Sequence, residues 1–146
     1  MKKSLFSCLA DQFKPIPSLP SPSNTSLHSK TVLIIGANTG LGFETAKQLG
    51  HYKPSRLILA CRNLDKGNAA AKRIKEELGA DFDGAIEVWI VDLADFASVK
   101  AFVGNVMGGE GEEGGLARLD LLVLNAGVAQ HTNLEYIPTK DGFEHA

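Results

Sequence analysis

Three glycines, Gly36, Gly40 and Gly42, directly follow an apolar run at Val32–Ile35, and this spacing suits the binding of a phosphate. A glycine after a buried strand lets the backbone turn sharply, and the missing side chains let a charged group approach the main chain. The N-terminus of the next helix would present free N–H groups and partial positive charge. A Walker A loop is excluded, because Phe43 stands where its lysine is needed. On this motif alone, a glycine turn without a ligand is the alternative.

Strand-like and helix-like segments alternate from Lys30 onward and must position these glycines. Short apolar runs predict strands at 31–36, 56–60, 85–93 and 119–127. Helical spacing predicts helices at 41–50, 64–79 and 95–107. The apolar face of the last helix is predicted to consist of Phe96, Val99, Phe102, Val103 and Val106. The run Leu121–Leu124 is apolar without alternation, which predicts a strand covered on both faces. This alternation predicts an α/β fold with a doubly wound parallel sheet.

The composition is that of a globular protein without nucleic-acid or membrane signals. The chain has 146 residues, of which 44% are hydrophobic and 22% charged, with a net charge of −2. This balance argues against nucleic acid as a partner, and no apolar stretch approaches the ~18–20 residues of a transmembrane helix. Two distant cysteines, Cys8 and Cys61, favour a reducing compartment and hence a cytoplasmic location. The spacing of His and Cys predicts no metal site.

Residues 1–29 are predicted to be a Pro/Ser-rich extended arm, and residues 30–146 to be the folded domain. The stretch "KPIPSLPSPSNTS" favours polyproline-type backbone and excludes a helix through its four prolines, Pro15, Pro17, Pro20 and Pro22. A linker is the favoured interpretation, and a ligand for a proline-recognition domain is the alternative. The apolar run Leu5–Ala10 is too short and too polar for a secretory signal.

Five short motifs follow one another along the chain: "GANTGLG" at 36–42, "ACRN" at 60–63, "VDLAD" at 91–95, "NAG" at 125–127 and "TKDGFEHA" at 139–146. In this order they resemble the short-chain dehydrogenase/reductase family, in particular its retinol-dehydrogenase-like and WW-domain-oxidoreductase-like branch. Ile35 and Leu124 depart from the threonine and asparagine that are usual there. The resemblance implies an NAD(P)-binding Rossmann-type fold with strand order 3-2-1-4, and hydride transfer between carbonyls and alcohols.

The resemblance also implies a dinucleotide site built from four segments. Its residues would be Gly36, Asn38, Thr39, Gly40, Leu41, Gly42, Arg62, Asn63, Asp92, Leu93, Asn125, Ala126 and Gly127. Asp92 would accept a hydrogen bond from the adenine, and residues 125–127 would line the nicotinamide ribose. Arg62 stands where a carboxylate would bind the ribose 2′-hydroxyl, and its guanidinium suits a 2′-phosphate instead. NADP(H) is therefore predicted over NAD(H).

Arg62, Asp92 and residues 125–127 can also be interpreted without a ligand. Arg62 could be an exposed charge that Asp65 partly neutralises, and 125–127 a turn that ends a strand. Asp92 could cap the following helix, although Asp95 is better placed to do so.

The catalytic residues of this family are expected to be missing. Hydride transfer to a carbonyl needs a proton donor, for which the family uses a tyrosine, a lysine four residues later, a serine and an asparagine. Tyr136 and Lys140 have this spacing, but Pro138 would break the helix that must present both side chains on one face. The pair also precedes "DGFE", whereas the family's pair follows it. We therefore predict no catalytic residue, and a domain truncated after its fourth strand that lacks the catalytic half.

Two functions are left open at this stage. The first is an NADP-dependent oxidoreductase family member present as its cofactor-binding half, inactive alone, with a lipid-like carbonyl or alcohol as the substrate that the resemblance suggests. The second is a free-standing dinucleotide-binding or regulatory module without turnover. Arg62 and the "NAG" turn argue against a third class, the SAM-dependent methyltransferases. The fourth strand would be an exposed apolar edge, which predicts self-association.

Overall fold

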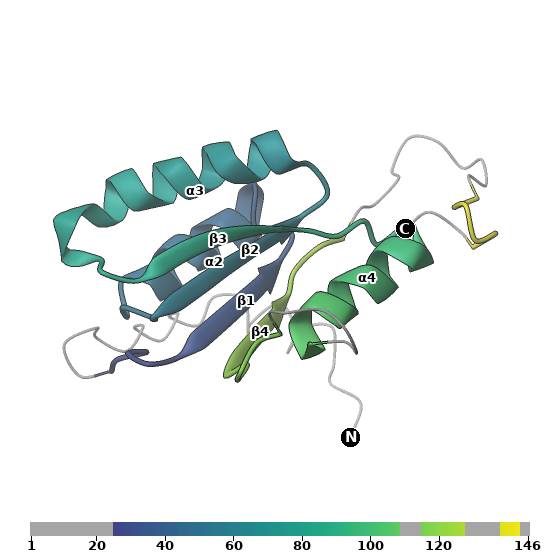
Figure 1. Ribbon diagram of the computed structural model, residues 1–146. Coiled ribbons are helices and arrows are strands. Elements are labelled where there is room, and N and C mark those ends of the chain that lie inside the picture. The colour runs from purple at the N-terminus through teal and green to yellow at the C-terminus, as the bar shows by residue number, and fades with distance from the viewer. Residues whose placement is uncertain (1–24, 109–114, 128–137, 144–146) are drawn as a thin grey trace, which may run out of the picture.

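The computed structural model describes residues 25–108, 115–127 and 138–143, so most of the predicted arm lies outside the described residues. Four parallel strands form one sheet in the order β3-β2-β1-β4. They are β1 (Thr31–Ile35), β2 (Arg56–Cys61), β3 (Ala85–Ile90) and β4 (Leu121–Leu124). The predicted α/β class is confirmed, and the strand order is the one that the resemblance implies (Figure 1).

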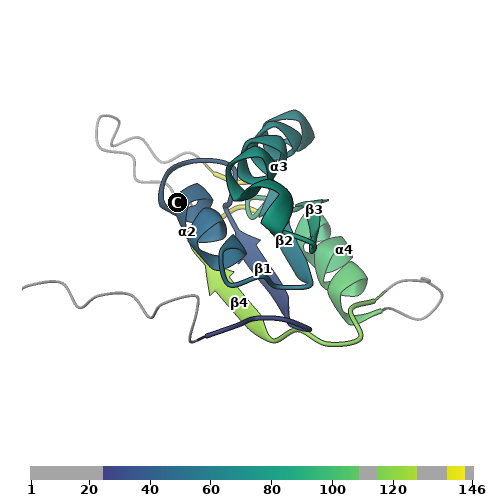
Figure 2. The same ribbon diagram turned by 90° about the vertical axis from the view of Figure 1, so that its left-hand side faces the viewer.

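Helices cover both faces of the sheet. They are α2 (Gly40–Gly50), α3 (Leu64–Leu78) and α4 (Phe96–Met107), and a short 3-10 turn, η1 (Gly79–Asp81), follows α3. Figure 2 shows α2 and α3 on one face and α4 on the other. The chain winds outward from β1 to β3 and then returns to place β4 on the other side of β1, so the carboxyl ends of β1 and β4 form a topological switch point. None of the helices within the described residues is long and apolar enough to cross a bilayer.

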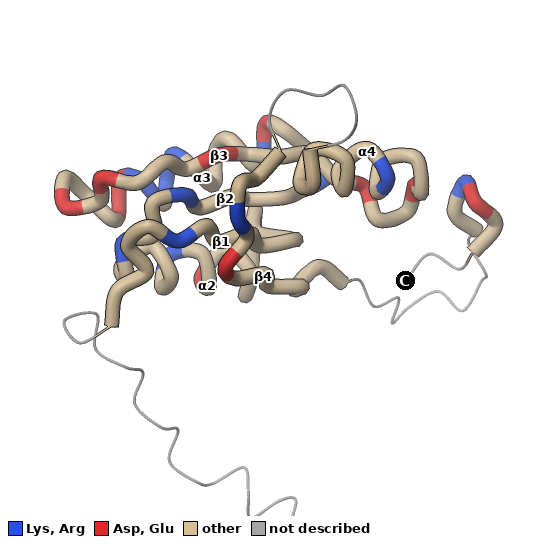
Figure 3. Tube along the Cα trace, turned by 60° about the horizontal axis from the view of Figure 1, so that its bottom comes forward, with Lys and Arg blue, Asp and Glu red and all other residues tan. Residues whose placement is uncertain are grey.

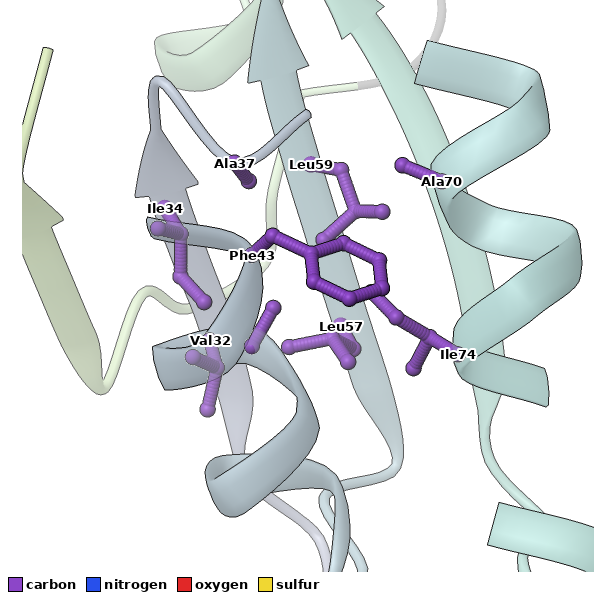
Figure 4. Close-up of a cluster of buried hydrophobic side chains, with 9 residues drawn as sticks. Val32, Ile34, Ala37, Phe43, Leu57, Leu59, Ala70 and Ile74 are labelled. Carbon is purple, nitrogen blue, oxygen red and sulfur yellow. The ribbon is translucent and has the colours of Figure 1, made fainter. Parts of the chain in front are cut away.

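The core consists of two apolar layers, one on each face of β1 and β2. On the α2 and α3 side, Phe43 packs among Leu57, Leu59 and Ile74 (Figure 4). A smaller layer on the α4 side includes Leu33, Ile58 and Phe102. Burying each such side chain is worth roughly 1.5–3 kcal/mol. The two central strands are therefore the rigid base on which the loops at their carboxyl ends are held.

The prediction that β4 is covered on both faces is wrong. Leu121 and Val123 pack against the core on the α2 side, whereas Leu122 and Leu124 are 46% and 75% exposed. Leu122 pairs with Leu33 of β1, so these exposed side chains belong to the α4 face. The helix α4 packs toward the opposite edge of the sheet and leaves this face of β4 open.

The predicted apolar face of α4 is correct at its centre and wrong at two positions. Phe102 is buried and meets the ring of Trp89 edge-on at 6.1 Å, and Val99 and Val106 are partly buried beside it. Phe96 and Val103 are nearly half exposed, because α4 contacts the sheet along a narrow stripe. The ring of Phe96 packs instead against the ring of Phe143, in the segment 138–143.

Candidate cofactor-binding site

The chain passes from β1 to α2 through a turn whose glycines have different roles. Gly36 has a φ of +83°, which favours glycine, and its N–H donates to the carbonyl of Ala60 at 2.8 Å. A Cβ on Gly36 would lie 2.8 Å from the Cα of Ala126, so no side chain fits there. A Cβ on Gly42 would overlap the carbonyl oxygen of Gly36. Gly40 has a φ of +59° and open space around it. The turn thus needs glycine for conformation and for close packing.

The end of β4 braces this turn. The carbonyl of Ile35 accepts from the N–H of Asn125 at 3.1 Å and from the N–H of Ala126 at 2.9 Å. The side-chain amide of Asn125 donates to the carbonyl of Gly36 at 3.2 Å. The "NAG" segment therefore supports the glycine turn as well as standing beside it, a role that the sequence interpretation did not include.

The helix α2 begins without a side-chain cap, unlike the other two described α-helices. Thr39 is its N-cap residue but makes no capping hydrogen bond, and the first turn holds no acidic residue. By contrast, Asn63 caps α3 by accepting from the N–H of Lys66 at 2.9 Å. Asp95 caps α4 by accepting from the N–H of Ala97 at 3.0 Å. The first N–H groups of α2 are thus left for another acceptor, which suits an anion.

A cavity of about 590 Å³ lies over the carboxyl ends of the strands and is of ordinary size for a ligand site. The predicted site residues that line it are Gly36, Asn38, Thr39, Leu41, Arg62, Asp92, Leu93, Asn125, Ala126 and Gly127. Gly40, Gly42 and Asn63 do not line it; the first two shape the turn, and the third caps α3.

Further residues line this cavity without having been predicted as site residues: Ile35, Ala60, Cys61, Val91, Ala94 and Thr139. All of them except Thr139 lie within two positions of a predicted site residue. They could therefore have been predicted from the positions at which the strands end. Thr139 is remote in sequence, and its only signal was its place at the start of "TKDGFEHA".

The polar groups of the cavity wall differ in how they are engaged. Arg62 is exposed, and none of the ion pairs among the described residues includes it. Asp92 accepts from the N–H of Ala94 at 3.0 Å, and its own N–H donates to the hydroxyl of Ser98 at 2.9 Å. Burial raises the pKa of the Cys61 thiol, which makes it a neutral part of the wall. The cavity wall therefore combines a cation that has no ion-pair partner in the described part of the chain with an acidic loop that hydrogen bonds hold in place.

Only one residue of the sequence-spaced pair Tyr136 and Lys140 belongs to the part of the chain that the structure describes. Tyr136 lies outside the described residues, and the ammonium of Lys140 pairs with Asp95 at 2.8 Å. Among the parts of the chain that the structure describes, no three His, Cys, Asp or Glu side chains gather where they could hold a metal ion.

A parallel sheet of this order, with a glycine turn opening onto a cavity at its switch point, defines a Rossmann-type fold. Residues 30–146 match the family model described as short chain dehydrogenase. The chain belongs to this family of oxidoreductases, which bind NAD(P), and the predicted family is thus confirmed.

The relatives support the same assignment. The chain is 41% identical over 120 residues to the short chain dehydrogenase/reductase mfmJ of Annulohypoxylon moriforme, covering 82% of this chain and 32% of the relative. It is 40% identical over 122 residues to retinol dehydrogenase 11 of Mus musculus, covering 84% and 34%. Menthone neomenthol reductase from Mentha piperita has a similar structure, with a TM-score of 0.55, 37% identity, and coverage of 69% and 33%. The chain spans about a third of the length of these curated relatives.

Proposed function

We propose that this chain binds NADP(H) as the cofactor-binding part of a carbonyl/alcohol oxidoreductase. The observation that carries the proposal is the glycine turn beside the N-terminus of α2, which has no side-chain cap. Arg62, which has no ion-pair partner among the described residues, lies on the same cavity wall. Family membership favours this function over a free-standing module. The chain spans only part of its relatives, so the activity of a whole enzyme is proposed from their names and not from this site.

The residues present fit such a cofactor. The turn packs tightly against the protein at Gly36 and Gly42, which fixes its shape. The space around Gly40 is open, and its neighbours Thr39 and Leu41 line the cavity, so a pyrophosphate could approach the main chain there. Residues from 36 to 42 would hold that group through backbone N–H groups and the dipole of α2. Asp92 and Leu93 would contact the adenine, and residues 125–127 would line the nicotinamide ribose. When bound, the nicotinamide supplies the hydride chemistry.

Arg62 supports NADP(H) over NAD(H). It follows β2 directly, its guanidinium is exposed, and no described carboxylate pairs with it. A guanidinium binds a phosphate through two charge-assisted hydrogen bonds. Asn63 is occupied as the cap of α3, so its side chain contributes by ordering the start of that helix next to Arg62.

We propose a lipid-like alcohol or carbonyl as the substrate class, on the strength of the family branch and the relative named as a retinol dehydrogenase. We do not assign Lys140 to proton transfer in this chemistry, because its ammonium forms an ion pair with Asp95. We also propose a reducing, cytoplasmic location, because the thiol of Cys61 is buried and free.

Titration with NADPH and with NADH, followed by calorimetry, tests the proposal. We expect the unmodified chain to prefer NADPH, and Arg62→Asp to reduce or reverse that preference. Lys100→Asp changes the net charge equally at an exposed position of α4 and serves as the control, which should keep the preference. Equal affinities of the unmodified chain for the two cofactors would sink the NADP assignment, and no binding of either would sink the function itself.

A further inference from the structure

Residues 139–143 form a compact turn that Thr139 closes on itself. The N–H of Thr139 donates to the carbonyl of Phe143 at 2.7 Å, and its carbonyl accepts from the N–H of Gly142 at 3.0 Å. Its hydroxyl accepts from the N–H of Phe143 at 3.2 Å. Gly142 has a φ of +81°, which lets the chain reverse. Because these bonds tie both ends together, the position of Thr139 follows the position of the whole turn.

Three different contacts hold this turn on the N-terminal end of α4. The ammonium of Lys140 pairs with the carboxylate of Asp95 at 2.8 Å. The carboxylate of Asp141 accepts from the N–H of Phe96 at 2.7 Å, one of the donors that a helix cannot satisfy itself. The rings of Phe96 and Phe143 lie 5.2 Å apart. Figure 1 shows the turn in yellow beside the end of α4, and Figure 3 shows a basic and an acidic residue in it.

Asp95 and Lys140, the two residues of the ion pair, each directly follow residues that line the cavity. Asp92, Leu93 and Ala94 line the cavity and immediately precede Asp95, while Thr139 lines it and immediately precedes Lys140. The loop that precedes α4 is itself ordered by the hydrogen bonds of Asp92. A contact between positions 95 and 140 therefore fixes two parts of the wall that are 45 residues apart in sequence.

We propose that Lys140 and Asp141 are positioning residues of the dinucleotide site, which hold Thr139 in the cavity wall by fastening its turn to Asp95 and Phe96. This inference rests on the proposed function. We assign neither residue a catalytic role: Pro138 argues against a helix that would present Tyr136 and Lys140 together, and the ammonium of Lys140 pairs with Asp95. The effect should be modest, because exposed ion pairs contribute little individually.

The test measures the dissociation constant of NADPH for the full chain, for four single variants and for the double variant that combines Lys140→Met with Asp95→Asn. Lys140→Met removes the positive charge, and Lys140→Arg keeps a positive charge at that position. Asp95→Asn removes the charge but keeps an oxygen that can still cap α4. Lys72→Met is the matched control, since Lys72 forms an ion pair with Glu76 and is as exposed as Lys140, at 78% against 80%.

We expect Lys140→Met and Asp95→Asn each to weaken NADPH binding by about two- to fivefold, the range that exposed ion pairs allow. Combining the two should give no further loss, and Lys140→Arg and Lys72→Met should bind like the unmodified chain. Amide hydrogen exchange at Phe96 and Phe143 should quicken in Lys140→Met.

Unchanged NADPH affinity in Lys140→Met, or an equal loss in Lys72→Met, would overturn the positioning role while the proposed function stands. Unchanged exchange at Phe96 and Phe143 would overturn the contact itself. Failure of the unmodified chain to bind either dinucleotide would instead overturn the proposed function.

Discussion

The side-chain amide of Asn125 donates to the carbonyl oxygen of Gly36 at 3.2 Å, which joins the end of β4 to the first residue of the glycine turn. The two residues are 89 positions apart in sequence. The same carbonyl lies directly against Gly42, the third glycine of the motif. The shape of the glycine turn is therefore set jointly by its own glycines and by the strand that docks beside it.

Asn125→Ala should weaken both the fold and the site. It removes one hydrogen bond, which is worth about 1 kcal/mol, and leaves the carbonyl of Gly36 without this donor. We expect a lower free energy of unfolding and weaker NADPH binding, measured by denaturation and calorimetry. Asn105→Ala, at an exposed position of α4, is the control and should change neither quantity appreciably. An Asn125→Ala chain with unaltered NADPH affinity would show that the brace does not shape the turn.

Two helical glycines should respond in opposite directions to the same substitution. A Cβ at Gly42 would overlap the Gly36 carbonyl and approach the Asn125 amide, so Gly42→Ala should cost about 1–3 kcal/mol of stability and weaken NADPH binding. A Cβ at Gly104 of α4 meets nothing within 4 Å, so Gly104→Ala should stabilise by roughly 0.4–1 kcal/mol. Thermal unfolding of both variants checks this, and a stabilised Gly42→Ala chain would contradict the packing argument.

Most of the fold could be predicted from local patterns, because strands buried on both faces and amphipathic helices leave strong sequence signals. The strand predicted at 85–93 ends at Ile90, because the next residues form the loop that Asp92 orders. The open face of β4 could not be predicted, since the apolar run Leu121–Leu124 reads the same whether or not a helix covers it. The contact between Lys140 and Asp95 could not be predicted either, because the two residues are 45 positions apart in sequence.

The ion pair between Arg56 and Glu87 should make stability depend on pH. The two carboxylate oxygens of Glu87 accept from the guanidinium of Arg56 at 2.8 and 2.9 Å. This pairing lowers the pKa of Glu87, and the indole N–H of Trp89 makes a smaller contribution in the same direction. A carboxylate with a lowered pKa stabilises the fold above its ordinary pKa, and this contribution is lost as the pH falls through the folded value. Glu87→Gln should therefore be less stable than the unmodified chain at pH 7, by a margin that shrinks toward pH 3.

Trp89 gives a direct readout of the same titration. It is the only tryptophan of the chain, and its indole N–H donates to Glu87 at 3.2 Å. We expect its fluorescence to change with acid below the ordinary pKa of glutamate and to lose that change in Glu87→Gln. Glu76→Gln, which removes the partner of an exposed ion pair on α3, is the control. A stability margin for Glu87→Gln that is constant from pH 7 to pH 3 would contradict this account.

The chain should self-associate through β4, with a second copy of itself as the partner. Within the described sheet β4 has a neighbour only at β1, so one of its edges is open. Strand edges with unpaired N–H and C=O groups pair readily with other strands. The exposed side chains of Leu122 and Leu124 add apolar surface on the face that α4 leaves open.

Size-exclusion chromatography with light scattering at micromolar concentration tests this association. We expect species larger than a monomer, and Leu124→Lys should shift them toward the monomer, because burying a lysine at a strand interface is unfavourable and charged edges resist pairing. Leu64→Lys places the same charge on an exposed leucine at the start of α3 and should leave the association unchanged. Since Leu124 is already 75% exposed, its replacement should not unfold the chain, so the two variants can be compared at equal stability. A sharp monomer peak for the unmodified chain, with cooperative thermal unfolding, would show that the open edge of β4 does not pair.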